Sequence, residues 1–283
     1  MAHLDNPNFV VFEAIRGLDG SPKFDGYGMR PFYFGTWFAW FKKEKKQYIK
    51  DQAYEPRVRQ TAREASERQL LLHIDIEHWP THNASDKVIE ESLDKMGDVV
   101  DWIHHEAPNV RCGFYGEFPH REYYSVWRYA EGLADIKAGK NSKWAKNVEK
   151  YKAQVIKWRK SNARHRKGRV KGRFHAEGVA DKVDFVLPSL FTLGRPSNIK
   201  KYPNILDDPA YKRWLVYARE NIKEARKYQK QVYVVLWPMY HGGDEGYIEE
   251  SFWQKQLEIA YQYADGLKIW HGGGKGSNKW DEE

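Results

Sequence analysis

Residues 70–80 read Leu70-Leu71-Leu72-His73-Ile74-Asp75-Ile76-Glu77-His78-Trp79-Pro80. This stretch is typical of a buried strand that becomes polar towards its end, where the proline stops strand pairing. Side chains alternate between the two faces of a strand, so we expect His73, Asp75 and Glu77 to share one face. Two carboxylates and an imidazole are costly to bury there without partners or a function. Asp75 and Glu77 are therefore our candidate active-site pair.

The rest of the chain predicts that this strand belongs to a parallel sheet. Apolar runs alternate with segments of helical periodicity, which is typical of a parallel sheet with helices on both faces. We expect further strands at residues 9–15, 31–37, 110–115, 183–187, 231–237 and 266–270, and helices at 56–68, 85–107, 208–229 and 248–263. The sequence thus predicts an α/β fold: a TIM-like (β/α) barrel of about seven strands, formed by residues 1–283 as one domain.

One segment interrupts the alternation of strands and helices. Residues 120–181 carry two expected helices, at 121–137 and 143–163, and we interpret this segment as a helical insertion in the barrel. Residues 137–173 contain 15 Lys and Arg but one acid, Glu149, whereas the whole chain has a net charge of +8. The positive charge therefore belongs to the insertion. It could draw in an anionic polymer, or it could form a solvated hairpin or a surface for a partner protein.

Nucleic acid is a competing ligand for the basic segment. Lys and Arg are interleaved there with Trp144, Tyr151 and Trp158, which suits phosphate contacts and base stacking. These aromatic residues recur at helical spacing, however, which favours packing of the hairpin. We therefore do not expect a nucleic acid partner.

Composition excludes several other classes of protein. Hydrophobic residues make up 41% and charged residues 30% of the chain, as in soluble globular proteins. No apolar run reaches 18 residues, so we expect no membrane span. The single Cys112 excludes an intrachain disulfide and a Cys-based zinc site. We expect no cofactor.

The spacing of Asp75 and Glu77 favours acid–base chemistry. Carboxylates two residues apart on one strand face have Cα atoms roughly 6–7 Å apart. Their mutual repulsion raises one pKa, and a carboxyl that keeps its proton can protonate a leaving oxygen, as in glycoside hydrolysis. Two alternatives stay open. The carboxylates could bond to helix N-termini or arginines, or they could bind a metal together with His73, His78 and His82.

Aromatic residues at strand ends could form the walls of a sugar site. Aromatics make up 15% of the chain, which has 12 Trp, and their flat faces can stack on sugar rings. As binding residues we expect Trp79, Phe191, Trp237, Tyr240 and Trp270, with His73, Glu117 and, from the first strand, Glu13. The alternative for the aromatic residues is core packing at strand ends. Tyr115 ends a neighbouring strand, and its phenol could hydrogen-bond a reacting group.

Four motifs resemble the hyaluronidases of insect venoms and animals, which are glycoside hydrolases. Residues 73–80 look like the Asp-x-Glu segment of that family, which also continues into an aromatic residue and a proline. Residues 113–119 resemble its Gly-Tyr-Tyr-x-x-Pro stretch, with one residue more. Residues 186–191 resemble its Leu-Pro-Ser-x-Tyr, and residues 265–270 its Asp-Gly-x-x-x-Trp-Gly. The motifs occur in the family's order, in patches from about residue 70 to 273. Chitinases and Asp-x-Glu muramidases are similar to a lesser degree.

This resemblance implies a barrel of about seven strands and a retaining mechanism in which the N-acetyl carbonyl of the substrate is the nucleophile. Glu77 would be the acid/base, Asp75 would orient the acetamido group, Tyr115 would assist it, and Trp270 would line the site. The chain departs from the family in three respects: Phe191 stands where the family has a tyrosine, the disulfide cysteines are absent, and the insertion is larger. If the substrate lacks an acetamido group, Asp75 could itself be the nucleophile.

We therefore predict a glycosidase that cleaves a polysaccharide that is anionic, contains N-acetylhexosamine, or both. The alternative is a non-catalytic protein on a barrel scaffold that binds an anionic glycan or nucleic acid. The substrate class leads us to expect a secreted or periplasmic protein, although residues 1–6 lack the basic start and apolar stretch of a signal peptide.

Overall fold

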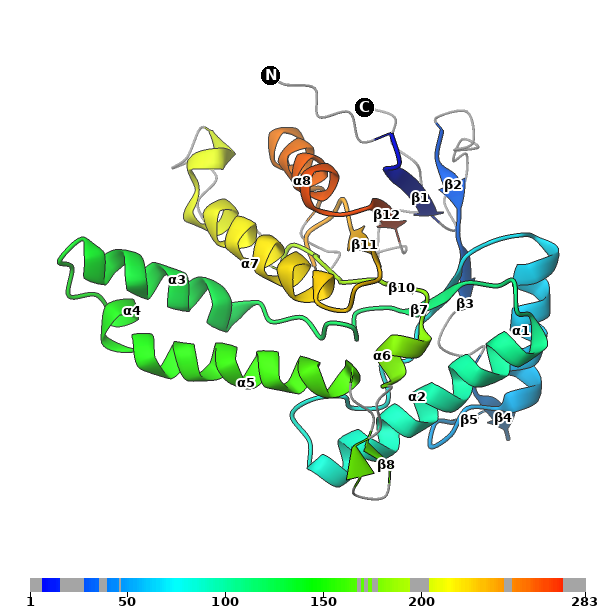
Figure 1. Cartoon of the computed structure of the whole chain (residues 1–283). Coiled ribbons are helices and arrows are strands. Elements are labelled where there is room, and N and C mark those ends of the chain that lie inside the picture. Colours follow the sequence, from blue (N-terminus) through cyan, green and yellow to red (C-terminus); the bar gives the residue numbers. More distant parts are fainter. Residues whose placement is uncertain are drawn as a thin grey trace.

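The computed structural model describes residues 7–15, 28–35, 40–45, 47–166, 169–170, 173–174, 178–193, 204–241 and 246–271. The described residues form a mixed α/β fold in which parallel strands lie beside helices (Figure 1). None of the helices in these ranges combines the length and the apolar character that crossing a bilayer requires.

The strands around the candidate pair form two parallel sheets. The larger sheet has the order β10 (Phe185–Val186), β11 (Gln231–Leu236), β12 (Gly266–His271), β1 (Val10–Ile15) and β2 (Arg30–Pro31). The smaller sheet has the order β3 (Tyr33–Gly35), β6 (Leu72–Ile74) and β7 (Cys112–Phe114). The pairings within both sheets are parallel, as the apolar runs predicted.

The two sheets meet on both sides. Only Phe32 separates β2 from β3 along the chain. On the other side, the Gly116 amide donates to the Leu187 carbonyl over 2.9 Å, and the Asp184 amide donates to the Cys112 carbonyl over 2.9 Å. These bonds place the end of β7 beside β10. The arrangement is compatible with a TIM-like fold, while full closure of a barrel stays a prediction.

Four helices flank the sheets where the sequence predicted them: α1 (Glu55–Glu67), α2 (Asp86–Glu106), α7 (Pro209–Arg226) and α8 (Glu250–Tyr263). The short α6 (Val179–Lys182) and a 3-10 helix at Ile205–Asp207 were not predicted. Side-chain caps explain where two of the predicted helices begin. Ser85 Oγ accepts from the Val88 amide before α2, and Asp208 Oδ1 accepts from the Ala210 amide before α7. Two short hairpins were not predicted: β4 (Lys42–Glu44) with β5 (Gln47–Ile49), and β8 (Arg169–Val170) with β9 (Arg173–Phe174).

The strands separate two hydrophobic clusters. One cluster joins the strands to the helices and contains Leu72, Ile74 and Ile76 from the quoted stretch. The other contains side chains from the opposite strand faces, such as Phe12, Phe32, Phe185, Tyr233 and Val235. This division is what alternation of side chains along each strand produces. Residues next to Leu72 and Ile74, on the other face, therefore point away from the helices.

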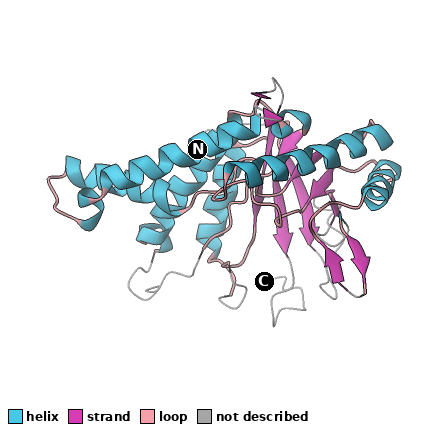
Figure 2. Cartoon of the chain, turned by 90° about the horizontal axis from the view of Figure 1, so that it is seen from below, coloured by secondary structure: helices cyan, strands magenta, loops and turns pink. Residues whose placement is uncertain are grey.

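The predicted insertion is a helical hairpin that extends away from the sheets (Figures 1 and 2). It consists of α3 (Tyr124–Lys137), α4 (Lys143–Lys146) and α5 (Val148–Arg166), so the second predicted helix is broken at Asn147. The rings of Trp127 and Trp144 lie 5.1 Å apart, and Tyr151 and Trp158 are buried. The aromatic residues thus pack the hairpin, as their helical spacing indicated.

Candidate active site

The candidate pair follows directly after β6. The strand ends at Ile74, earlier than predicted, but the alternation of side chains continues beyond it. Ile76 is fully buried in the helix-facing cluster, whereas His73, Asp75 and Glu77 line a pocket of about 230 Å³. The three polar side chains therefore share one face, as predicted from the pattern alone.

Aromatic rings from other strand ends complete much of this pocket. Tyr115, Phe191, Trp237 and Trp270 line it, together with Arg121 and His241. The rings of Phe191 and Trp270 stack, with centroids 5.7 Å apart at 27°. The Trp237 ring meets Trp270 edge-on at 4.9 Å. The structure thus brings two carboxylates and a wall of flat apolar rings into one cavity, which is a composition suited to a sugar.

Burial and mutual repulsion change the proton affinity of the pair. Burial, followed by the charge of Glu77, raises the pKa of Asp75 to about 6. The positive charge of Lys268 acts in the opposite direction. Lys268 is fully buried on β12, and its Nζ donates to His73 Nδ1. The proton affinity of Asp75 is therefore set by burial, by an exposed carboxylate and by a buried cation that act in opposite directions.

Tyr115 belongs to a second polar group of the pocket. Its hydroxyl lies 3.1 Å from Ser189 Oγ, to which Arg121 Nη1 donates over 3.3 Å. The Tyr115 ring stacks on His73, with centroids 5.3 Å apart. Burial raises the pKa of Tyr115 above its usual range, so this phenol stays protonated and can donate a hydrogen bond.

Two of the predicted binding residues lie near the pair but in the core. Glu117 is 8% exposed, and Thr81 Oγ1 donates to its carboxylate. Burial raises the pKa of Glu117 to about 8. Trp79 is 3% exposed, and its Nε1 donates to the Lys50 carbonyl over 2.7 Å. Neither side chain lines the pocket.

Tyr240 and Glu13 also lie outside the pocket. Tyr240 is fully buried, and its hydroxyl donates to Glu249. Phe12 and Ala14 flank Glu13 on β1, and Phe12 belongs to the cluster between the strands. Strand alternation therefore points Glu13 to the opposite face. For Tyr240 and Trp79 the alternative expectation, core packing at a strand end, describes what the structure contains.

Two residues that line the pocket, Arg121 and His241, and one that is buried beside His73, Lys268, were not predicted. Arg121 and His241 follow strand ends by several residues, and no local pattern marks them as pocket residues. Lys268 did leave a signal, because it is a lone charge within the apolar run of β12. Lysine is rarely fully buried without a partner. Lys268 is fully buried, and its partner is His73.

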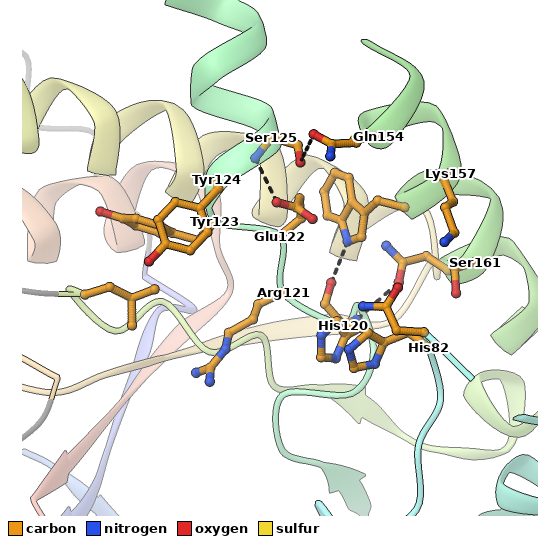
Figure 3. A pocket seen from close by; sticks show the side chains of 14 residues that line it. His82, His120, Arg121, Glu122, Tyr123, Tyr124, Ser125, Gln154, Lys157 and Ser161 are labelled. Atoms are coloured by element: carbon orange, nitrogen blue, oxygen red, sulfur yellow. Dashed lines mark hydrogen bonds between the residues drawn. The ribbon is translucent and has the colours of Figure 1, made fainter. Parts of the chain in front are cut away.

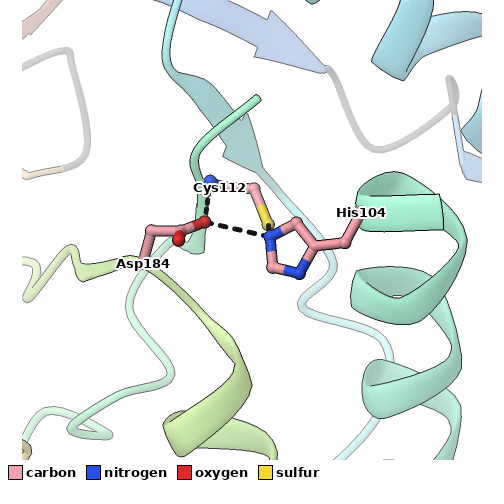
Figure 4. Close-up of side chains that lie close together, drawn as sticks. All are labelled: His104, Cys112 and Asp184. Carbon is pink, nitrogen blue, oxygen red and sulfur yellow. Dashed lines mark hydrogen bonds and ion pairs between the residues drawn. The ribbon is translucent and has the colours of Figure 1, made fainter. Parts of the chain in front are cut away.

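The metal alternative does not fit the candidate pair. His78 is exposed, and His82 lines a different hollow. In the described part of the chain, metal-ligand side chains converge instead at His104, Cys112 and Asp184, whose ligand atoms lie within 4.8 Å of one another (Figure 4).

Hydrogen bonds account for this second group. Asp184 Oδ2 accepts from the Cys112 amide over 2.8 Å and lies 3.0 Å from His104 Nε2. Burial alone would raise the pKa of Asp184, but these two partners lower it overall. The group therefore ties the starts of β7 and β10 to α2 without any need for an ion.

No family model and no curated protein matches this chain. Solved structures that are similar to it include two of bee venom hyaluronidase. One is bee venom hyaluronidase in a monoclinic crystal, with a TM-score of 0.52 and 13% identity over 93% of this chain and 91% of that chain. The other is bee venom hyaluronidase in complex with a hyaluronic acid tetramer, with a TM-score of 0.51 and 12% identity over 93% and 90%. The chain therefore has a hyaluronidase-like fold along nearly its whole length.

Proposed function

We propose that this protein is a glycosidase that cleaves a polysaccharide at the pocket of Asp75 and Glu77. The observation that carries the proposal is the meeting of two carboxylates with the rings of Phe191, Trp237 and Trp270 at the ends of several parallel strands. Functional groups of α/β barrels gather at such strand ends. The fold likeness to a hyaluronidase, one of whose structures holds a hyaluronic acid tetramer, supports a polysaccharide substrate.

Glu77 is the proposed acid/base. It is exposed at the mouth of the pocket, where it can reach the oxygen between two sugars. In the first step the acetamido oxygen of the substrate attacks the anomeric carbon, the glycosidic bond breaks, and Glu77 protonates the leaving oxygen. In the second step Glu77 takes a proton from a water that opens the cyclic intermediate, so the anomeric configuration is retained.

Asp75 and Tyr115 are the proposed partners of the acetamido group. The carboxylate of Asp75 can accept from the acetamido N–H and stabilise the positive charge that develops on it. The protonated phenol of Tyr115 can donate to the acetamido oxygen. Phe191 offers no hydroxyl, and instead stacks on Trp270. We expect Tyr115 to be the phenol that acts in this pocket.

The two sheets are proposed to form one barrel of about seven strands. The short separation of β2 from β3 and the hydrogen bonds between β7 and β10 support this topology. The presence of a hydrophobic cluster enclosed between the strands also supports it. In such a barrel the pocket would lie at the carboxyl ends of the strands.

The test is release of reducing ends from hyaluronan, chondroitin, chitin, peptidoglycan and uronate-rich marine glycans. We expect activity on an N-acetylated polymer, and a loss of about 10²–10⁴-fold in Glu77→Gln, because the acid/base is removed. Glu250→Gln is the matched control, since Glu250 is exposed in the first turn of α8. Full activity of Glu77→Gln would overturn the proposal. Activity confined to polymers without N-acetyl groups would instead leave Asp75 as the nucleophile.

A further inference from the structure

A second and larger hollow adjoins the candidate active site. It has a volume of about 650 Å³ and shares Arg121 with the catalytic pocket. Figure 3 shows Arg121 on one side of it and Lys157 with Ser161, from α5, on the other, with His82 and His120 between them. The basic hairpin thus forms one wall of a space that opens next to Asp75 and Glu77.

A third hollow continues in the same direction. It has a volume of about 530 Å³ and shares Asn83, Lys157 and Ser161 with the second hollow. Its lining extends further along α5, to Lys160 and Arg164. Each hollow shares lining residues with the next, and we call this row of three hollows, from the carboxylate pair to α5, the path.

Positive charges follow this path. Lys157, Lys160 and Arg164 are three and four residues apart, so they share one face of α5 and span roughly 10 Å along its axis. Lys157 and Lys160 are exposed and form no ion pair with any residue in the described ranges. Arg164 pairs with Asp86 over 2.6 Å. Two of these three cations therefore have no ion-pair partner among the described residues.

The acid and the histidines of the second hollow do not cancel that charge. The carboxylate of Glu122, which accepts from the Ser125 amide over 2.8 Å, is matched in number by the cation of Arg121, so Lys157 leaves this hollow with a positive charge. Burial lowers the pKa of His120 to about 2 and lowers that of His82, so both rings are neutral. The floor is held in place, since Trp158 Nε1 donates to the His120 carbonyl over 2.6 Å. The hollow is thus a preformed polar groove with a positive wall.

We propose that the three hollows form one groove that holds an anionic polysaccharide chain next to the bond to be cleaved, with Lys157 and Lys160 pairing with its carboxylate or sulfate groups. This inference rests on the proposed function and adds to it a substrate-binding surface on the hairpin. Charge complementarity and continuity with the catalytic pocket support this occupant. The groove leads to a pocket whose carboxylates and aromatic rings suit a sugar, which favours a glycan over nucleic acid.

Binding separates this inference from catalysis. The background is the Glu77→Gln variant, and the ligands are chondroitin sulfate and hyaluronan chains, titrated calorimetrically at several salt concentrations. The test variant adds Lys157→Ala/Lys160→Ala. The matched control adds Lys146→Ala/Lys150→Ala, which removes two exposed lysines of the same hairpin that lie outside the groove.

We expect the test pair to weaken chondroitin sulfate binding about tenfold and to flatten its salt dependence, because two ionic contacts are lost. The control should leave both nearly unchanged, and neutral chitin oligosaccharides should bind all variants alike. Equal losses in test and control variants would overturn the inference. So would single-stranded DNA that binds more tightly than the glycans and loses its affinity with the same two lysines.

Failure of the proposed function looks different. If the wild-type protein cleaves none of the glycans but binds chondroitin sulfate through Lys157 and Lys160, the glycosidase is refuted and the groove stands. If it cleaves chondroitin or hyaluronan and KM does not change in Lys157→Ala/Lys160→Ala, the groove is refuted and the glycosidase stands.

Discussion

Aspartates occur near both ends of the parallel strands, and their pKa values are shifted in opposite directions. At the start of β7 and β10, the carboxylate of Asp184 has a backbone amide and His104 as partners, and its pKa is lowered. Beyond the other end of the neighbouring β6, Asp75 is half-buried beside a second carboxylate in an open pocket, and its pKa is raised to about 6. The partners of Asp184 stabilise its charged form, whereas the surroundings of Asp75 destabilise the charged form of that residue.

The difference separates a structural role from a functional one. Hydrogen bonds to a charged carboxylate stabilise the folded protein. A carboxylate with such partners, like Asp184, has a structural role. A carboxyl held near another acid, in a cavity that a ligand can enter, costs stability and is the kind of group that catalysis uses. Three predictions test this comparison.

The largest expected effect is on activity. Asp75→Asn should lower kcat by about 10²–10³-fold, because the carboxylate that orients the acetamido group is lost. Asp184→Asn, at the opposite ends of the strands, should leave kcat unchanged. Steady-state kinetics on the best polymer of the panel measures both. Equal losses in the two variants would remove the distinction between the two ends.

The second prediction concerns stability and has opposite signs for the two aspartates. The raised pKa of Asp75 means that the folded state binds its proton more tightly, so this contribution to stability is present below pH 4 and is lost as pH rises through about 6. Asp75→Asn should therefore raise the free energy of unfolding above pH 6, by at most about 3 kcal/mol.

Asp184→Asn should lower the free energy of unfolding at pH 7 by about 1–2 kcal/mol, because two hydrogen bonds to a charged group are weakened. The lowered pKa of Asp184 stabilises the folded state above pH 4, and this contribution is lost on acidification. Urea unfolding of both variants and the wild type at pH 4, 6 and 8 measures the two trends. Destabilisation by Asp75→Asn at pH 8 would contradict the comparison.

The smallest expected effect comes from the buried cation. The charge of Lys268 lowers the pKa of Asp75, so Lys268→Met should move that pKa above 6. The acid limb of the pH profile of kcat/KM should shift to higher pH. Lys255→Met, which removes a surface lysine paired with Glu258, is the control and should not shift it. An unchanged or lowered limb would show that Lys268 does not act on Asp75.

Much of the site could be predicted because strand alternation is a local rule. The order of residues 72–77 alone decides that His73, Asp75 and Glu77 face one way and Leu72, Ile74 and Ile76 the other. Apolar spacing likewise predicted the long helices, and the spacing of aromatic residues predicted the packed hairpin.

The tertiary structure decided what happens beyond the strand ends. Trp237 enters the pocket whereas Tyr240, three residues later, is buried against Glu249, because the turn after β11 sets their directions. The partnership of Lys268 with His73 and the place of Arg121 between two hollows join residues from distant parts of the chain. The sequence by itself determined which side chains share a face. Only packing decided which faces meet, because the directions of turns and the contacts between distant segments depend on the whole fold.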